Sequence, residues 1–81
     1  MSIYEARLFA LRDEDYLRFN AGLIPTVDRT KMIGVRNPDV KRLAKEIAAE
    51  GNFLPFLNDL PHTYYEENNL HAELIHFVGK D

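Results

Sequence analysis

Basic side chains that could bind an anion are concentrated in the middle of this chain. Residues 29–45 carry six basic side chains and one acidic side chain, whereas the whole chain of 81 residues has a net charge of −3. Lys41, Arg42 and Lys45 fall opposite the apolar face of a predicted helix, and Arg36 comes just before that helix begins. Free backbone N–H groups at a helix start and a basic outer face both suit contact with phosphate. A solvated helix face has the same composition, and composition alone favours that simpler interpretation.

Glu67 and His71 form a second candidate site. They lie four residues apart within the apolar stripe of the last predicted helix, so we expect them to be partly buried neighbours. A carboxylate and an imidazole on an apolar face can form an acid/base pair or begin a metal site, but no third or fourth metal ligand is evident. We therefore interpret the pair as structural. We predict no catalytic residue, no metal site and no cofactor in this chain.

Two adjacent tyrosines could add base stacking to a nucleic-acid surface. Tyr64 falls on the same apolar stripe as Leu70 and Leu74, so we expect it to pack in the core. Tyr65 lies on a different side of the helix and is the tyrosine that could be exposed.

Helices must position these residues, because glycine and proline divide the chain into segments with helical periodicity. The third helix is the clearest, since Asn37 can cap it, Pro38 suits its first turn and Gly51 supplies a left-handed stop. Its apolar stripe comprises Val40, Leu43, Ala44 and Ile47. The other predicted helices cover residues 3–12, a segment capped by Asp13 with Tyr16, Phe19 and Leu23 on one face, residues 53–60, and a last helix that begins at a Thr63/Glu66 capping box and runs to about Val78. Residues 26–36 are predicted to be a loop with one helical turn.

The composition is that of one globular domain. Hydrophobic residues make up 46% of the chain and charged residues 28%, and the absence of cysteine excludes disulfides and thiolate chemistry. No apolar run is long enough for a membrane span, and the N-terminus lacks a signal-peptide pattern. We expect residues 1–81 to form a single all-α domain in the cytoplasm, without membrane contact.

Three longer runs carry a more specific signal. They are Ile33-Gly34-Val35-Arg36-Asn37-Pro38, Leu43-Ala44-Lys45-Glu46-Ile47, and the segment from Leu60-Pro61-His62 through Tyr64-Tyr65-Glu66-Glu67-Asn68-Asn69-Leu70-His71. Together they resemble the N-terminal part of bacterial DNA alkylation repair proteins of the AlkD-like group. The resemblance implies a HEAT-like solenoid of about five helices in antiparallel pairs, whose concave surface cradles duplex DNA. Characterised members of the family are DNA glycosylases that release N3- and N7-alkylated purines without a metal.

The resemblance implies DNA binding by this chain but carries no catalytic residue to it. The family's catalytic aspartate is flanked by tryptophans, and this sequence has no tryptophan. The loop from Gly34 to Asn37 approaches DNA in the resembling proteins, and the basic face of the following helix extends that surface. The DNA-binding residues that we predict are therefore Gly34, Arg36, Asn37, Lys41, Arg42 and Lys45. We expect the chain to be the N-terminal portion of a longer solenoid and inactive alone; the alternative is a non-catalytic helical scaffold that binds protein.

The last predicted helix has an unusually wide apolar stripe. It comprises Leu70, Leu74, Ile75, Phe77 and Val78. We expect part of this stripe to remain uncovered and to pair two copies of the chain as a two-fold dimer.

Overall fold

Two fourteen-residue helices, α3 (Asn37–Glu50) and α5 (Tyr65–Val78), form the centre of the molecule. The computed structural model describes residues 3–78, which contain three further α-helices, one 3-10 turn and no strand. These are α1 (Ile3–Ala10), α2 (Glu14–Leu23), the 3-10 turn η1 (Arg29–Lys31) and α4 (Leu54–Asn58). The predicted all-α class is confirmed, and the turn η1 lies in the segment predicted to be a loop with one helical turn. None of the helices within residues 3–78 is both long enough and apolar enough to cross a membrane.

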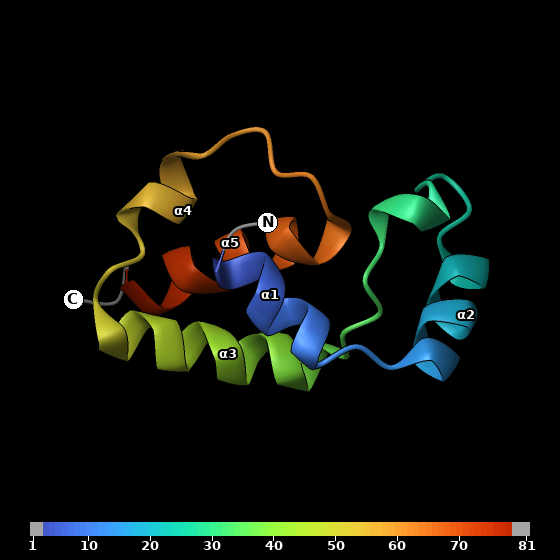
Figure 1. Ribbon diagram of the computed structural model, residues 1–81, viewed down its shortest axis with the longest axis horizontal. Coiled ribbons are helices and arrows are strands. Elements are labelled where there is room, and N and C mark those ends of the chain that lie inside the picture. The colour runs from blue at the N-terminus through green and yellow to red at the C-terminus, as the bar shows by residue number, and fades with distance from the viewer. Residues whose placement is uncertain (1–2, 79–81) are drawn as a thin grey trace.

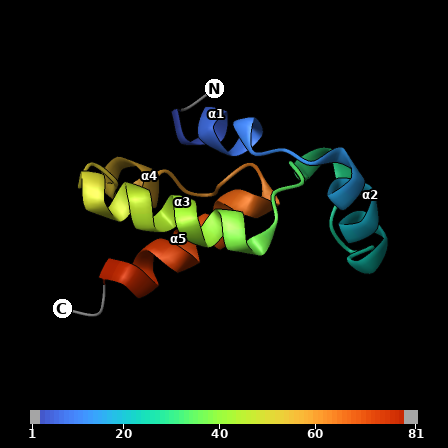
Figure 2. The same ribbon diagram turned by 90° about the horizontal axis from the view of Figure 1, so that it is seen from below.

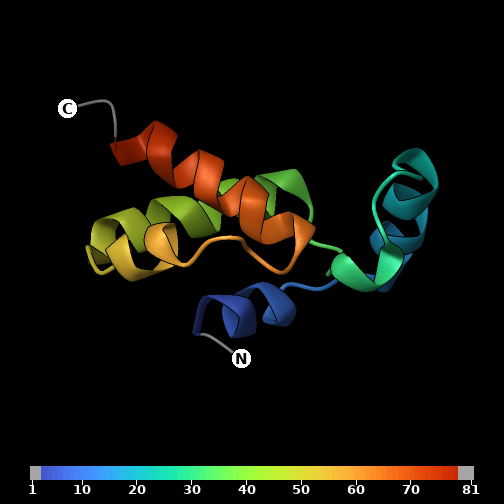
Figure 3. The same cartoon turned by 90° about the horizontal axis from the view of Figure 1, so that it is seen from above.

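Helices α3 and α5 cross each other while running in the same general direction (Figures 1 and 3). Both begin at the end of the molecule that faces α2. After α3 ends, α4 and the connector that follows it lead the chain back to that end, where α5 begins. This differs from an antiparallel arrangement of successive long helices, because the link across residues 51–64 is long enough to bring the chain back before α5 begins. The N-terminal halves of α3 and α5 consequently lie side by side.

Helix α1 runs roughly antiparallel to α3 and packs on one side of the two long helices (Figures 1 and 3). At one end the Tyr4 hydroxyl donates a hydrogen bond to the carbonyl of Asn52, just beyond α3. One turn further on, the Arg7 guanidinium binds Glu50 at 2.8 Å and Glu46 at 3.4 Å. These contacts tie the beginning of α1 to the end of α3.

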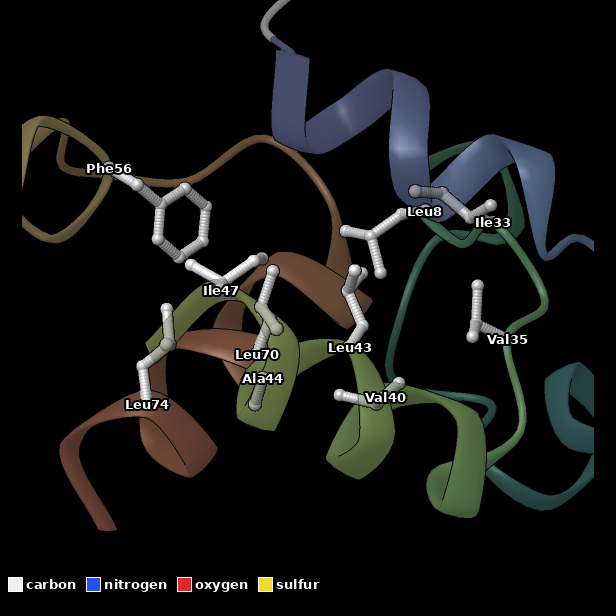
Figure 4. Close-up of a cluster of buried hydrophobic side chains, with 10 residues drawn as sticks. All are labelled: Leu8, Ile33, Val35, Val40, Leu43, Ala44, Ile47, Phe56, Leu70 and Leu74. Atoms are coloured by element: carbon white, nitrogen blue, oxygen red, sulfur yellow. The ribbon is translucent and has the colours of Figure 1, made fainter. Parts of the chain in front are cut away.

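The core lies where α1, α3, α4 and α5 meet (Figure 4). Its apolar members come from every one of these helices and from the strand-like segment before α3. They are Leu8, Ile33, Val35, Val40, Leu43, Ala44, Ile47, Phe56, Leu70 and Leu74. The four predicted stripe residues of α3 are all in this set, so that part of the sequence interpretation is confirmed.

The wide stripe predicted on α5 is divided between core and surface. Leu70 and Leu74 are completely buried, and Phe77 packs against the core from its edge. Ile75 and Val78 remain 53% and 39% exposed. The body of the molecule, which we define as α1, α3, α4, α5 and their core, therefore covers only part of the stripe.

Helix α2 and η1 form an arm, residues 13–32, that projects from one end of the body (Figures 1 and 2). Leu17 and Met32 are the only residues of the arm that are buried. Phe19 and Leu23 share one face of α2, as predicted, but both are 64% exposed, so this face is not buried. Asp13, Tyr16 and Leu17, at the beginning of α2, contact the segment before α3, whereas Phe19 and Leu23 lie further along the helix in solvent.

The helix ends show which local signals were correct. The Asp13 carboxylate accepts a hydrogen bond from the N–H of Tyr16 and caps α2, and Gly51 stops α3 with a φ of 87°. Helix α3, however, already includes Asn37 as its first residue, and Arg36 occupies the cap position without a side-chain cap. Asn37 is thus not the cap that we predicted.

The start of α5 uses a different glutamate from the one predicted. Glu67, not Glu66, completes the turn, since its carboxylate accepts a hydrogen bond of 3.0 Å from the N–H of Tyr64. Glu66 instead points into the molecule and is 1% exposed. Its carboxylate accepts hydrogen bonds from the backbone N–H groups of Ile33 at 2.8 Å, Gly34 at 2.8 Å and Val35 at 3.3 Å. This single side chain fixes the hinge, residues 32–35, which joins the arm to α3.

Candidate nucleic-acid interface

A polar groove of about 360 Å³ runs between the N-terminal halves of α3 and α5. It is lined by Asn37, Val40, Lys41, Tyr65, Asn69, Ala72 and Glu73. The groove brings together two of the predicted DNA-binding residues, Asn37 and Lys41, and the tyrosine singled out for stacking. These residues are far apart in the sequence and meet because α3 and α5 begin at the same end of the molecule.

Helical periodicity explains how each wall of the groove is built. Asn37 and Lys41 line the groove one four-residue step apart on α3, and Lys45 continues the same stripe beyond the lining residues; all three are exposed. On α5, Tyr65, Asn69 and Glu73 repeat the same four-residue step in a stripe beside Leu70 and Leu74. Each wall is therefore a polar stripe beside a buried apolar stripe.

Asn69 and Glu73 also line this groove, although the sequence did not predict them as members of the site. The signal was present, because their spacing from Tyr65 places all three on one side of α5. That wall alone does not indicate which residues lie opposite it, since the partner wall is about 30 residues earlier in the chain. Only the packing of α3 on α5 brings Lys41 and Glu73 into one groove.

The remaining basic residues of the predicted site are engaged with acidic neighbours. The Arg36 guanidinium lies 3.2 Å from the carboxylate of Asp13 and 5.0 Å from the centre of the Tyr16 ring. Arg42 forms an ion pair with Asp39 one turn earlier in α3. Both arginine side chains are more than half exposed, so they remain accessible to an anion that replaces the carboxylate.

Gly34 has a structural place that the sequence did not indicate. It is buried with a φ of 94°, and a Cβ atom there would lie 2.7 Å from the Cβ of Leu17. Its carbonyl accepts a hydrogen bond from the N–H of Asp13, and its own N–H is held by Glu66. The hinge N–H groups are thus satisfied internally, and Gly34 acts by allowing the arm to approach rather than by facing a ligand.

Glu67 and His71 have separate partners instead of the mutual contact that we expected. Glu67 is 3% exposed and binds the backbone of Tyr64, while the Nδ1 atom of His71 lies 2.8 Å from the Nε2 atom of His62. The His62 ring also stacks on Phe56, with ring centres 4.5 Å apart. The expected partial burial is correct for His71, whereas Glu67 is buried more deeply than expected.

Burial moves the pKa values of these groups in opposite directions. It raises the pKa of the Glu67 carboxyl above its ordinary value, against the hydrogen bond from Tyr64. Burial lowers the pKa of His62, and the neighbouring His71 ring lowers it further. Both groups are consequently biased towards their neutral forms, as expected for side chains that support packing. Within residues 3–78 there is no group of three or more His, Asp or Glu side chains that could hold a metal ion.

Comparison with models of known protein families, with curated proteins and with solved structures finds no match to this chain. The candidate interface therefore stands on the geometry of its own residues.

Proposed function

We propose that this chain binds duplex DNA through the groove between α3 and α5 and the basic stripe that continues from it. The observation that carries the proposal is the meeting of Asn37, Lys41 and Tyr65 in one groove. An amide, an ammonium group and an aromatic ring are the groups with which proteins contact phosphates, sugars and bases. Lys45 lies one turn beyond Lys41 on the same side of α3 and extends the positive surface along the helix.

The six predicted DNA-binding residues play unequal parts in binding. Asn37, Lys41 and Lys45 form the contact surface, because no acidic side chain pairs with them in residues 3–78. Arg36 and Arg42 contribute at its edges after exchanging a carboxylate for a phosphate. Gly34 contributes indirectly, through the shape of the hinge.

The resemblance to DNA alkylation repair proteins supports the same ligand. On that basis we propose that the chain supplies part of a DNA cradle in a glycosylase-like protein with HEAT-like helix packing. The sequence runs that carry the resemblance include the hinge, the start of α3 and the start of α5, which are the segments that border the groove. The chemistry of base release is not assigned to any residue of this chain.

Fluorescence anisotropy with a labelled duplex of about two helical turns tests the proposal. Affinity should fall steeply between about 50 mM and about 200 mM salt, because binding releases counterions from the phosphates. Lys41→Ala should weaken binding several-fold and reduce the slope of log K against log salt by about 0.9. Lys31→Ala is the matched control, since Lys31 is an exposed lysine on η1 outside the groove.

Glu73→Gln provides a second, opposite readout. Removing this carboxylate from the groove wall should strengthen DNA binding, because the carboxylate repels the phosphates that Lys41 attracts. Equal weakening by Lys41→Ala and Lys31→Ala would show only non-specific attraction and would remove the groove from the proposal. Binding that is unchanged by Arg36→Ala at low salt would remove Arg36 from the contact surface.

A second candidate function, a helical scaffold for a protein partner, is favoured by the exposed apolar side chains of the arm. Phe19 and Leu23 lie one turn apart on α2, and each is 64% exposed. A scaffold of this kind would bind its partner with little dependence on salt, and Phe19→Ser would abolish that binding while leaving DNA affinity unchanged.

We also propose that Ile75 and Val78 pair two copies of the chain. Sedimentation velocity at high concentration should then show a dimer that Ile75→Ser converts to monomer.

A further inference from the structure

We propose that a second groove, between α1, α2 and η1, binds a small organic anion that has an aromatic or aliphatic body. The groove has a volume of about 440 Å³ and is lined by Phe9, Arg12, Leu17, Arg29, Thr30, Met32 and Tyr64. This size lies within the usual range of small-molecule sites. The two tyrosines at the start of α5 separate the two grooves, since Tyr64 lines this one and Tyr65 lines the other.

The floor of the second groove is apolar and held in place from several sides. Leu17 and Met32 are each only 4% exposed, and the Phe9 and Tyr64 rings meet edge to face with centres 5.3 Å apart. Four side chains from α1, α2, the hinge and the connector before α5 thus converge on one surface. A flat or branched apolar group would gain contact there without a rearrangement of the core.

Two guanidinium groups supply the positive charge of the groove. Arg29 has no ion-pair or hydrogen-bond partner for its side chain among residues 3–78. Arg12 pairs with Glu14 alone in the described part of the chain, at 3.9 Å, and both of these side chains are substantially exposed, so this contact contributes little. A carboxylate or a phosphate monoester can accept paired hydrogen bonds from a guanidinium group.

Two neighbouring aspartates, Asp28 and Asp13, form no ion pair with Arg29 or Arg12 within residues 3–78. The Asp28 carboxylate accepts hydrogen bonds from both the N–H and the hydroxyl of Thr30, and it caps η1. Asp13 binds Arg36 on the other side of the hinge. The groove therefore combines an apolar floor with one unpaired arginine, Arg29, and one weakly paired arginine, Arg12, which is complementary to an amphiphilic anion. This inference is independent of DNA binding at the α3/α5 groove.

Titration of the isotopically labelled chain with naphthoate, followed by amide chemical shifts in NMR spectra, tests the inference. The expected shifts are saturable and centred on Phe9, Leu17, Thr30 and Met32. Naphthamide has the same rings without the charge, and acetate has the charge without the rings, so each should bind at least about ten-fold more weakly. Naphthyl phosphate distinguishes the two anion types: tighter binding than naphthoate identifies a phosphate ester as the preferred group, and weaker binding identifies a carboxylate.

Arg29→Ala should weaken naphthoate binding about five-fold or more, while Arg29→Lys should retain part of the affinity. Arg18→Ala is the matched control, because Arg18 is an exposed arginine of α2 that does not line the groove. Both arginines are on the surface, so circular dichroism should show an unchanged fold in each variant. Equal binding of naphthamide, equal loss in Arg18→Ala, or shifts centred outside the groove would each overturn the proposal.

Discussion

The body and the arm of this molecule are held by different kinds of contact. The body shares one core, to which all of its helices contribute buried apolar side chains (Figure 4). The arm buries only Leu17 and Met32, and it leaves Phe19 and Leu23 in solvent. Burial of apolar area therefore explains why the body is a unit but does not explain why the arm has a defined position.

The arm is positioned by a few contacts at the hinge. Leu17 packs so closely on Gly34 that an added Cβ atom would lie 2.7 Å from the Leu17 Cβ. The Asp13 N–H donates a hydrogen bond of 2.8 Å to the Gly34 carbonyl, and the Glu66 carboxylate on α5 accepts one from the Gly34 N–H. Such contacts depend on exact geometry rather than on area, so single substitutions at the hinge should have larger effects than its small size suggests.

Replacement of Glu66 by alanine should produce the largest loss of stability. It would leave the N–H groups of Ile33, Gly34 and Val35 buried without acceptors, and the expected loss is about 3–5 kcal/mol. Urea unfolding followed by circular dichroism measures it. Because this variant could unfold outright, Glu66→Gln provides a graded readout: one amide oxygen remains to accept hydrogen bonds, and the loss should be smaller. Full stability of Glu66→Ala would show that the hinge does not depend on this carboxylate.

Gly34→Ala should have the next largest effect, and Gly51→Ala is its matched control. Both glycines have a positive φ, but only at Gly34 would an added Cβ atom meet the rest of the molecule. We expect about 2–4 kcal/mol of destabilisation at Gly34 and about 1 kcal/mol at Gly51, where only the backbone conformation opposes alanine. Hydrogen exchange should also show faster exchange of the Asp13 amide in Gly34→Ala alone. Equal effects at the two positions would mean that contact between the arm and the hinge is not tight.

Features that depend on nearby residues could be predicted from the sequence, and features that depend on distant residues could not. The cap at Asp13, the stop at Gly51 and the apolar stripe of α3 depend on residues within one or two turns, and the sequence predicted them correctly. The partners of Glu66 lie 31 to 33 residues earlier in the chain, and no local pattern indicates that a glutamate in a first turn points inward. The predicted Thr63/Glu66 box failed for that reason.

The candidate interface follows the same rule. The sequence predicted correctly that Lys41 and Lys45 lie on the outer face of α3, because helical periodicity fixes that face. It did not predict that Tyr65 and Asn69 lie opposite Lys41, since that depends on α3 and α5 running in the same direction. The pairing of His71 with His62 was missed because the connector before α5 has no periodic pattern.

Glu67→Gln should sharpen the contrast between the two adjacent buried glutamates. Glutamine keeps the hydrogen bond to the Tyr64 N–H and removes a buried charge, so we expect a gain of about 0.5–1 kcal/mol at neutral pH. The raised pKa of Glu67 means that the folded state favours the protonated carboxyl. The stability that the folded state gains from protonated Glu67 is thus fully present below the ordinary carboxyl pKa, and it is lost as pH rises through the pKa of Glu67 in the folded state. The stability difference between variant and parent should therefore shrink as pH falls; a loss of stability at neutral pH would contradict this.

His62 should give the body a pH dependence of the opposite sign. Burial and the nearby His71 lower the pKa of His62, while Asp59 opposes the shift. A lowered pKa means that the folded state favours the neutral ring. The stability gained from the neutral ring is therefore present above the ordinary imidazole pKa, and it is lost as pH falls through the pKa of His62 in the folded state. NMR titration should place the pKa of His62 below that of a free imidazole, and His71→Ala should raise it part of the way back. An unshifted His62 in the intact chain would show that the pair is open to solvent.

Arg36→Ala should have the smallest effect on the fold, although Arg36 connects the hinge to the arm. Its ion pair with Asp13 is on the surface, with the two side chains 53% and 39% exposed, and water competes for both charges. Its position over the Tyr16 ring adds a weak attraction. We expect the melting temperature to fall by no more than about 4 °C, and by less at high salt, where the ion pair is screened. The capping hydrogen bond from Tyr16, which is the main cause of the lowered pKa of Asp13, should survive the substitution. A fall in melting temperature as large as that of Gly34→Ala would mean that charge, rather than the close approach of Leu17 to Gly34, positions the arm.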